Sequence, residues 1–468
     1  MIEMSLAEVA EVVGGVAHGA ASVTGAAFVD TRTPEPGGLF VALAGERVDG
    51  HDFASAAGDA GAVAVLGSRP TDLPTVVVDD VTAALGLLAR HVVDRLPDVV
   101  VLAMTGSQGK TGTKDYLAHV LSEAGPTVAT RGNFNNELGV PLTVLRATPE
   151  TRYLVVEMGA RGVGHIAELC RIAPPHVAAV LNVGTAHIGE FGGREAIARA
   201  KGEIVEALAA DGTAVLNADD HLVAAMAART SATVTTFGDG SAGHSPDVSV
   251  SEVTTDEIGR QSFELAHRGS YATVHLAQVG AFQWRNAAAA AAMALAAGLD
   301  LDTVADSLAD AGPASRWRME LTERADGLVV VNDAYNANPE SMRAALETLA
   351  GIGSRSGRRT VAVLGEMREL GDEAAAAHRG TGAYAAEIGV DVLVAVGPGA
   401  AAIAEGFRAG GTGGVTIPTA GRDEAVDWLR HNVSAADVVL VKASRGAALE
   451  LIADDLLTRG GNEGSTTR

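Results

Sequence analysis

The sequence predicts an α/β protein with three domains, and three observations support this prediction. Short apolar segments alternate with amphipathic helical stretches, which is typical of parallel sheets with crossover helices. The alternation stops and starts again within 468 residues, a length at which about three domains are expected. Glycine and alanine are abundant and aromatic residues make up only 4%, a composition that favours tight turns and closely packed helices.

The expected architecture is a small N-terminal α/β domain, a central parallel-sheet domain and a C-terminal Rossmann-like α/β domain. The expected bounds are residues 1–97, 98–314 and 315–458. The tail, 459–468, is rich in Gly, Ser, Thr and charged residues and is predicted to be disordered.

Charge and cysteine content argue against several classes of function. The net charge is −23, from 35 basic and 58 acidic residues, whereas binding to nucleic acid or to anionic membranes needs clustered basic residues. Cys170 is the only cysteine, so an intrachain disulfide is impossible and a reducing compartment, the cytoplasm, is expected. The most apolar segment, 286–299, is too short to span a bilayer. We therefore expect no nucleic-acid partner and no membrane insertion.

The N-terminal domain combines short strands with two polar loops. Strands are expected at 25–30, 38–42, 62–66 and 75–78, and helices at 5–13 and 81–95. The loops are either solvated surface or a recognition surface whose arginines bind a phosphate. Their candidate residues are Thr31, Arg32, Arg47, Asp49, Gly50 and His51.

Residues 99–113, VVVLAMTGSQGKTGT, have the order of strand, glycine-rich turn and helix that a phosphate-binding loop requires. Backbone N–H groups and the helix N-terminus attract the anion. Lys110 would reach the β- and γ-phosphates, and the Thr111 hydroxyl would bind Mg²⁺. Met104 stands where the general pattern has its first glycine, and a chance glycine-rich turn is the alternative interpretation. The candidate phosphate-binding residues are Thr105, Gly106, Ser107, Gln108, Gly109, Lys110 and Thr111.

Polar side chains stand at the ends of the next strands of the central domain. These strands are expected at 99–104, 153–157, 177–182 and 214–217, and Glu157, Asn182 and Asn217 end the last three. Functional side chains collect at the carboxyl ends of parallel strands, so we expect these groups beside the phosphate loop. Residues 237–271 are predicted to form an antiparallel edge or a set of hairpins, followed by a helix at 283–297.

The C-terminal domain is predicted to repeat the plan of sheet and helices. Strands are expected at 329–332, 360–364, 391–396 and 437–442, and helices at 340–349, 373–388 and 423–429. No dinucleotide-binding fingerprint follows the first strand, but polar segments follow most of the strands. Two domains that each present a polar edge predict a cleft that domain motion closes.

A carboxylate, an imidazole and an amine form a candidate metal group in the central domain. Glu157 is a hard oxygen ligand that suits Mg²⁺, whereas His187 is less usual for Mg²⁺ and could be an ordinary loop histidine. Lys201 would repel a metal and is otherwise a solvated helix lysine, unless carbamylation gave it two ligand oxygens. Asn135 and Asn136, in the segment 133–141, indicate either a simple turn or amide groups aimed at a substrate.

These motifs resemble those of the Mur ligase family, which forms peptide bonds with ATP in peptidoglycan synthesis. The short loop TGSQGKT, EMG at 157–159, Asn182 with His187, AKGE at 200–203 and NADD at 217–220 match, and the resemblance runs from about residue 30 to 446. The segments GNFNNELGVP (132–141), DAYNANP (333–339) and LGEM (364–367) are most similar to family members that add D-alanyl-D-alanine to UDP-N-acetylmuramoyl-tripeptide.

The resemblance implies a role for each candidate. Lys110, Thr111 and Glu157 would hold the ATP phosphates and a first Mg²⁺, and His187 with a carbamylated Lys201 would hold a second. The family's remaining binding residues correspond to Asn286 for adenine, Arg318 and Asp333 for ATP, and the loops at 30–32 and 45–51 for the UDP-sugar. Further candidates for substrate binding are Asn135, Asn136, Asn336 and Asn338. Phe282-Gln283 departs from the His-Asn pair that relatives often have before Asn286.

The implied reaction has two steps. The terminal carboxylate of the tripeptide attacks the γ-phosphorus of ATP, which gives an acyl phosphate and ADP, and the amine of D-alanyl-D-alanine then displaces phosphate. A monomer acting on small molecules is expected. Two alternatives stay open: a ligase of the same family that adds a diamino acid or glutamate, against which residues 336–339 argue, and a nucleotide switch or binding protein without ligase chemistry.

Overall fold

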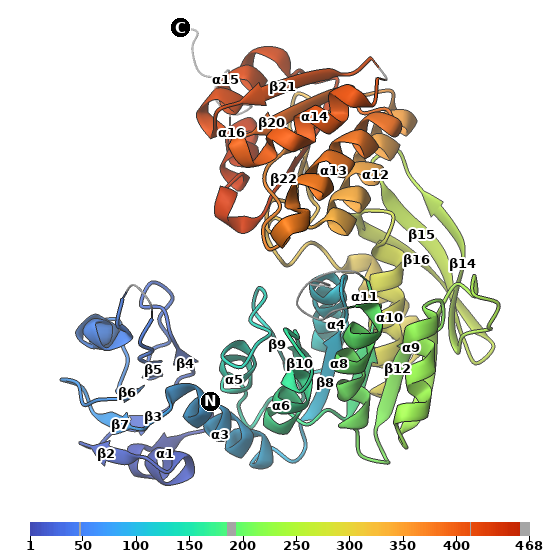
Figure 1. Cartoon of the computed structure of the whole chain (residues 1–468). Coiled ribbons are helices and arrows are strands. Elements are labelled where there is room, and N and C mark those ends of the chain that lie inside the picture. The colour runs from blue at the N-terminus through green and yellow to red at the C-terminus, as the bar shows by residue number, and fades with distance from the viewer. Residues whose placement is uncertain (46–47, 185–192, 412, 459–468) are drawn as a thin grey trace, which may run out of the picture. The chain divides into compact units, whose positions relative to one another are not determined.

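The computed structural model describes residues 1–45, 48–184, 193–411 and 413–458 (Figure 1). The predicted disordered tail, 459–468, lies outside the described residues. The chain divides into two compact units, the first made of 1–183, 195–247 and 289–300 and the second of 184–194, 248–288 and 301–468. Within the described residues, none of the helices combines the length and the apolar character that crossing a membrane needs.

The prediction of an α/β protein is confirmed, because three separate sheets contain parallel strands linked by helices. The bounds 1–97, 98–314 and 315–458 stay predictions. The first sheet has the order β2-β7-β6-β5-β4, and only β2 runs antiparallel to its neighbour. Its core includes the rings of Phe28 and Phe40, whose centroids are 5.5 Å apart. The N-terminal elements are β1 (Met4–Ser5), α1 (Leu6–Val13), β2 (Val16–His18), β3 (Ser22–Val23), β4 (Ala27–Phe28), β5 (Leu39–Val41), η1 (Gly50–Phe53), α2 (Ala54–Asp59), β6 (Ala64–Gly67), β7 (Thr75–Val77) and α3 (Val81–Asp94).

The central sheet of the first unit has the order β13-β12-β11-β8-β10-β9, and its strands are parallel. Strand β8 lies between β10 and β11, so its continuous apolar run is buried on both faces, as parallel sheets require. The elements of this region are β8 (Val100–Thr105), α4 (Lys110–Ala124), β9 (Thr127–Ala129), α5 (Gly139–Val144), β10 (Tyr153–Glu157), α6 (His165–Ile172), β11 (Val177–Val180), α8 (Arg194–Glu206), β12 (Thr213–Asn217), α9 (His221–Ala224), η2 (Ala225–Arg229) and β13 (Thr233–Gly238).

The predicted antiparallel region, 237–271, is partly wrong. Phe237 lies in β13 and pairs in parallel with Asn217 of β12. The antiparallel strands begin later and extend further, from β14 to β16. Alternating apolar and polar residues indicate a half-buried strand but not its direction, which the connection to the sheet decides. The elements concerned are β14 (Val248–Thr255), β15 (Arg260–His267), β16 (Ser270–Val279), α10 (Gln283–Ala296) and α11 (Leu301–Asp310).

The C-terminal sheet has the order β17-β18-β22-β19-β20-β21, and only β17 is antiparallel. Val329 and Val331 pack with α12, α13 and α14, whereas Val330 packs with α15 and α16 on the other face. The sequence predicted this doubly wound plan but missed β17, α14, β21 and α16. The elements are β17 (Glu320–Glu323), β18 (Val329–Asn332), α12 (Pro339–Ser356), β19 (Arg359–Leu364), η3 (Gly371–Glu373), α13 (Ala374–Glu387), β20 (Val392–Val396), η4 (Pro398–Ala400), α14 (Ala401–Ala409), β21 (Val415–Thr419), α15 (Arg422–Asn432), β22 (Asp437–Lys442), η5 (Arg445–Ala447) and α16 (Glu450–Thr458).

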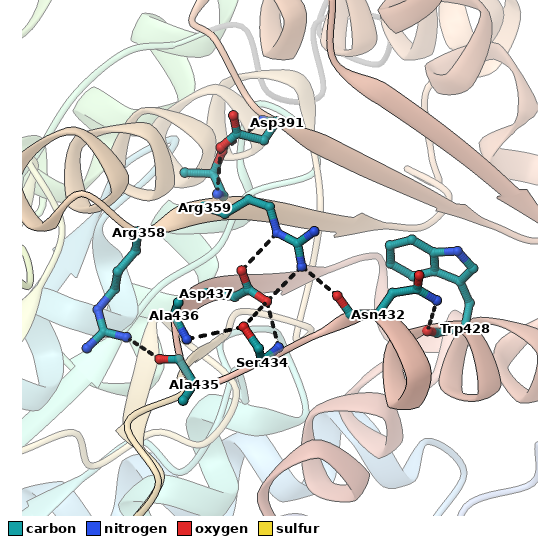
Figure 2. Close-up of polar contacts among 10 residues, drawn as sticks. Arg358, Arg359, Asp391, Trp428, Asn432, Ser434, Ala435, Ala436 and Asp437 are labelled. Atoms are coloured by element: carbon teal, nitrogen blue, oxygen red, sulfur yellow. Dashed lines mark hydrogen bonds and ion pairs between the residues drawn. The ribbon is translucent and has the colours of Figure 1, made fainter.

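Polar residues at the amino-terminal edge of this sheet bind one another (Figure 2). Arg359, which begins β19, forms a bidentate pair with Asp437, which begins β22, with both N–O distances 2.8 Å. The backbone N–H of Ser434 donates to the same carboxylate at 2.6 Å, and Arg358 donates to the carbonyl oxygen of Ala435 at 2.8 Å. This edge is therefore a structural network, and the candidate active-site residues lie at the opposite, carboxyl edge.

Candidate active site

The predicted phosphate loop has the geometry that the sequence indicates. Strand β8 ends at Thr105 and α4 begins at Lys110. Gly109 caps the helix with φ +81°, a left-handed conformation that favours glycine. The amine of Lys110 donates to the carbonyl oxygen of Gly106 at 2.6 Å, so the lysine side chain folds back over the turn.

Asn182, two residues beyond β11, fixes this loop from the neighbouring strand. Its side-chain oxygen accepts the N–H of Gln108 at 2.9 Å, its amide donates to the Gln108 carbonyl at 3.1 Å, and its own carbonyl accepts the N–H of Ser107 at 3.2 Å. The sequence placed Asn182 at a strand end but did not indicate this supporting role, because the contact joins residues 74 positions apart.

Glu157, at the end of β10, joins the loop to the asparagine-rich segment. Its carboxylate is 1% exposed and accepts from the Thr111 hydroxyl at 3.1 Å and from the Asn135 amide at 2.7 Å. Asn136 accepts the N–H of Gly139 at 2.9 Å, which shapes the turn before α5. The predicted gathering of Thr111 and Glu157 is thus present, and Asn135 belongs to the same cluster.

Two residues behind Glu157 were missed by sequence reasoning. The backbone N–H of Glu157 donates to the hydroxyl of Thr130 at 3.0 Å, and the amine of Lys114 donates to the carbonyl of Thr130 at 3.0 Å. Lys114 also pairs with Asp115 at 2.7 Å and is 3% exposed. A helix lysine normally lies in solvent, so only its burial indicates that it supports the cluster.

Lys201, on α8, is 6% exposed. Among the described residues, none forms a hydrogen bond or ion pair with its amine. Burial lowers the pKa of Lys201 well below its ordinary value, and the positive charge of Lys110 lowers it further. Burial thus favours the neutral form of this amine more than in a solvated lysine. His187, its predicted partner, lies outside the described residues.

The two N-terminal loops differ in how their polar side chains are used. Arg32 pairs with Asp30 at 2.6 Å but is 87% exposed, so its guanidinium is available to a ligand. His51 is buried: its Nδ1 lies 2.5 Å from Asp49, and its Nε2 accepts the N–H of Ser68 at 2.9 Å. These partners place the proton on Nδ1.

The Asp49–His51 contact also has an electrostatic consequence. Hydrogen bonds from His51, and then from Arg69, lower the pKa of Asp49 to about 2. A side chain at Gly50 would collide with the backbone of Leu43. Asp49, Gly50 and His51 therefore hold the shape of their loop, Thr31 is half-buried, and Arg47 lies outside the described residues.

The candidates in the second unit cluster around a buried ion pair. Lys442, the last residue of β22, donates to Asp333 at 2.5 Å and to the carbonyl oxygen of Asn336 at 2.9 Å. The other oxygen of Asp333 accepts the N–H of Met319 at 3.1 Å. Lys442 therefore holds the segment after β18 in place, a role that the sequence did not reveal.

Other predicted residues of this unit have defined local contacts. The guanidinium of Arg318 lies 4.1 Å from the ring centroid of Tyr335. Asn338 caps α12 by accepting the N–H of Ser341 at 2.8 Å, and Asn286 donates to Gln283 at 3.0 Å. Arg318 and Asp333 are thus brought to one region through the segment 317–319, while Asn338 contributes a helix cap.

In these compact units the site residues form two groups. Lys110, Thr111, Glu157, Asn135 and Lys201 belong to the first unit. Arg318, Asp333, Asn336, Asn338 and Asn286 belong to the second. Among the described residues, no cluster of three or more His, Cys, Asp or Glu could bind a metal. A single carboxylate and a hydroxyl suit Mg²⁺, which keeps waters and takes substrate phosphate oxygens as further ligands.

Comparison with family models identifies all three parts of the chain. Residues 28–106 match the Mur ligase family catalytic domain, residues 104–294 match the Mur ligase middle domain, and residues 317–445 match the Mur ligase glutamate ligase domain.

Curated relatives match along almost the whole chain. The UDP-N-acetylmuramoyl-tripeptide–D-alanyl-D-alanine ligase of Mycobacterium tuberculosis is 44% identical, with 98% of each chain covered. The ligase of the same name from Escherichia coli is 37% identical, with 98% of this chain and 100% of the relative covered.

Solved structures lead to the same family. The crystal structure of MurF from Acinetobacter baumannii has a TM-score of 0.84 at 34% identity and covers 97% of this chain and 99% of its own. MurF ligase from Thermotoga maritima in complex with ADP has a TM-score of 0.78 at 30% identity, covering 94% of this chain and 98% of its own. From its P-loop cluster, its three matching domains and these full-length relatives, the chain belongs to the Mur ligase family.

Proposed function

We propose that this chain is an ATP-dependent ligase that joins D-alanyl-D-alanine to UDP-N-acetylmuramoyl-tripeptide. The observation that supports it most is the hydrogen-bonded cluster of Thr111, Glu157 and Asn135 at the end of a P-loop strand. It joins the nucleotide-binding loop to the segment that resembles the D-alanyl-D-alanine-adding members of the family, and the relatives from M. tuberculosis and E. coli bear this activity in their names.

The phosphate loop and Glu157 fit ATP with magnesium. Thr111 and Glu157 offer hard oxygen atoms, and Glu157 is buried with only neutral donors against it. A bound Mg²⁺ supplies charge neutralisation on the phosphate oxygens. In our proposal Lys110 binds the phosphates, Asn286 contacts adenine, and Arg318 and Asp333 bind ATP from the C-terminal domain.

Lys201 is proposed to carry a carbamate that, with His187, holds a second Mg²⁺. Its buried, neutral amine can attack carbon dioxide, so that one N–C bond forms and one proton leaves. The product has two oxygens and a negative charge, which would satisfy the site that now holds an unpaired amine.

The chain's contribution to the reaction is to position groups and neutralise charge. Lys110 stabilises charge on the phosphates while the tripeptide carboxylate attacks the γ-phosphorus and ADP leaves. The amine of D-alanyl-D-alanine then attacks the acyl phosphate, and phosphate leaves. We propose that Thr31, Arg32, Arg47, Asp49, Gly50 and His51 form the surface for the UDP-sugar, and that Asn135, Asn136, Asn336 and Asn338 orient the peptide substrates.

The proposed substrates also bear on where and how the chain works. ATP and a UDP-linked precursor are small molecules of the cytoplasm, so we place the reaction there. Each proposed role is filled by residues of one chain, and we propose that a monomer suffices.

A coupled assay of ADP release tests the function. With UDP-N-acetylmuramoyl-tripeptide present, D-alanyl-D-alanine should stimulate ADP release, whereas glutamate or a diamino acid should not. Lys110→Ala should lower kcat by about 100-fold or more, because one donor to the transferred phosphate is lost. Arg379→Ala, which removes a half-exposed cation paired with Glu405, is the matched control and should keep the activity. Full activity in Lys110→Ala would contradict the proposal, and slow ATP turnover unaffected by any acceptor would favour a nucleotide switch.

A further inference from the structure

The three consecutive residues Lys201, Gly202 and Glu203 on α8 each have a different environment. Lys201 is buried beside the phosphate loop, Gly202 faces an arginine, and Glu203 caps another helix. We propose that Arg229 and Glu203 are positioning residues that fix α8 on both sides, so that the amine of Lys201 points to the catalytic metal site. The inference rests on the proposed function of Lys201.

Arg229 binds the backbone of α8 in the turn before Lys201. Its guanidinium donates to the carbonyl oxygens of Ala198 at 2.9 Å and Arg199 at 2.8 Å, and its Nε donates to Glu206 at 2.8 Å. An arginine that holds two adjacent carbonyl groups and a side chain one turn later fixes both the rotation and the axial position of a helix.

Gly202 makes this approach possible. A Cβ atom at this position would overlap the guanidinium of Arg229. Gly202 has helical neighbours on both sides, where glycine is less favourable than alanine. The helical conformation therefore does not require glycine at position 202, but the close approach of the Arg229 guanidinium does.

Glu203 fixes the other side of α8. One carboxylate oxygen accepts the N–H of Gly164 at 2.6 Å, and the other accepts the N–H of Ala167 at 3.0 Å. These donors are at the N-terminus of α6, where backbone N–H groups and the helix dipole stabilise a carboxylate. Glu203 is 7% exposed, so it is a buried anchor between two helices.

Neither anchor touches Lys201 or a reacting atom, but the two surround it in sequence and leave α8 little freedom to rotate. A change of rotation would move the Lys201 amine away from Lys110 and into a different environment. We therefore expect the anchors to control how much of Lys201 is carbamylated and how well that group is oriented, with little effect on substrate binding by the N-terminal loops.

A double-mutant cycle tests the contact directly. Gly202→Ala should lower Tm, because the new methyl group displaces Arg229. In an Arg229→Ala background the same change should leave Tm unchanged or raise it, since alanine suits a helix interior better than glycine. Equal effects of Gly202→Ala in both backgrounds would overturn the proposal.

Kinetics and carbon-13 NMR separate positioning from a merely structural role. Arg229→Ala should lower kcat by about 10–100-fold, as the loss of a residue that orients a metal ligand does. The KM for UDP-N-acetylmuramoyl-tripeptide should stay unchanged. When the proteins are incubated with ¹³C-bicarbonate, the carbamate signal of the Arg229→Ala variant should be weaker than that of the intact chain. Arg229→Lys, which keeps the charge but not the fork geometry, should recover part of kcat.

Arg358→Ala is the matched control, because Arg358, in the second unit, also donates to two carbonyl oxygens, those of Gly327 and Ala435. Figure 2 shows the contact with Ala435. Arg358→Ala should lower Tm and leave kcat and the carbamate signal unchanged. If Arg229→Ala changes Tm alone, as this control does, positioning is overturned. If the intact chain shows no carbamate signal while the cycle and kcat behave as stated, the proposed modification fails and the positioning role of Arg229 stands.

Discussion

Two lysines, Lys201 on α8 and Lys442 at the end of β22, are buried to nearly the same extent but in opposite electrostatic environments. Lys201 is 6% exposed and Lys442 is 2% exposed. Lys442 has the carboxylate of Asp333 at 2.5 Å and a carbonyl oxygen at 2.9 Å, whereas no described residue pairs with Lys201. A buried charge is stable only when it is paired, so Lys442 is a structural anchor, whereas burial without a partner favours the neutral form of the Lys201 amine.

The chain contains only four lysines, Lys110, Lys114, Lys201 and Lys442, against 31 arginines. Three of the four are buried, and the other is in the phosphate loop. Arginine is therefore the usual surface cation of this chain, whereas its lysines are buried or stand at the phosphate loop. This distribution makes substitutions of the individual lysines informative.

Lys442→Met should give the largest effect, a loss of about 3 kcal/mol in the free energy of unfolding, because the partly buried carboxylate of Asp333 is left without its cation. Urea denaturation measures it. The double variant Lys442→Met with Asp333→Leu should be more stable than the single variant, since no unpaired charge remains. Equal stability of the two variants would show that the ion pair does not anchor this region.

Lys201→Met should have the opposite sign. In buffer free of bicarbonate and Mg²⁺, replacing an unpaired buried amine by a thioether of similar size should raise the free energy of unfolding by about 1 kcal/mol. The same variant should lose ligase activity in the ADP-release assay. Destabilisation comparable to that of Lys442→Met would mean that Lys201 has a stabilising partner, and the contrast between the two lysines would fail.

The third prediction concerns the pH dependence of that stability difference. The pKa of Lys201 is lowered in the folded state from 10.5, so the unfolded chain binds more protons between the lowered pKa and about 10.5. The stability contributed by this group therefore rises with pH across that window, by at most about 1.4 kcal/mol per pH unit.

Lys201→Met lacks this group, so its advantage over the intact chain should shrink as pH approaches 10.5. Thermal unfolding of the two proteins at a series of pH values measures the difference, in which other titrating groups cancel. A constant difference across the window would contradict the lowered pKa.

Sequence patterns were sufficient for most of the P-loop region. Lys110, Thr111 and Glu157 were expected to meet because two of them follow one strand and the third ends its parallel neighbour. The interpretation of His51 and Asp49 as recognition residues was less specific, since their side chains also bind each other. The sequence did not indicate the parallel direction of β13, because a half-buried strand has the same pattern in either direction.

The sequence did not indicate most of the residues that hold the candidate site residues in place. Lys114, Thr130, Asn182 and Arg229 have ordinary neighbours in the sequence, and their roles follow from contacts with distant segments. The scarcity of lysine was the one signal that could have pointed to Lys114 and Lys442. For Arg229 the signal was weaker still, a glycine inside a predicted helix next to a candidate lysine.

The sequence by itself determined the α/β fold class and the strand–turn–helix form of the phosphate loop, because each depends on local patterns of a few consecutive residues. The tertiary structure alone decided which charges are paired. Asp333 and Lys442 are 109 residues apart, and Asn135 and Glu157 are 22 apart. Burial and counter-ions come from segments that meet only after folding, so the same residue type, lysine, is paired with a carboxylate at position 442 and is buried without a described partner at position 201.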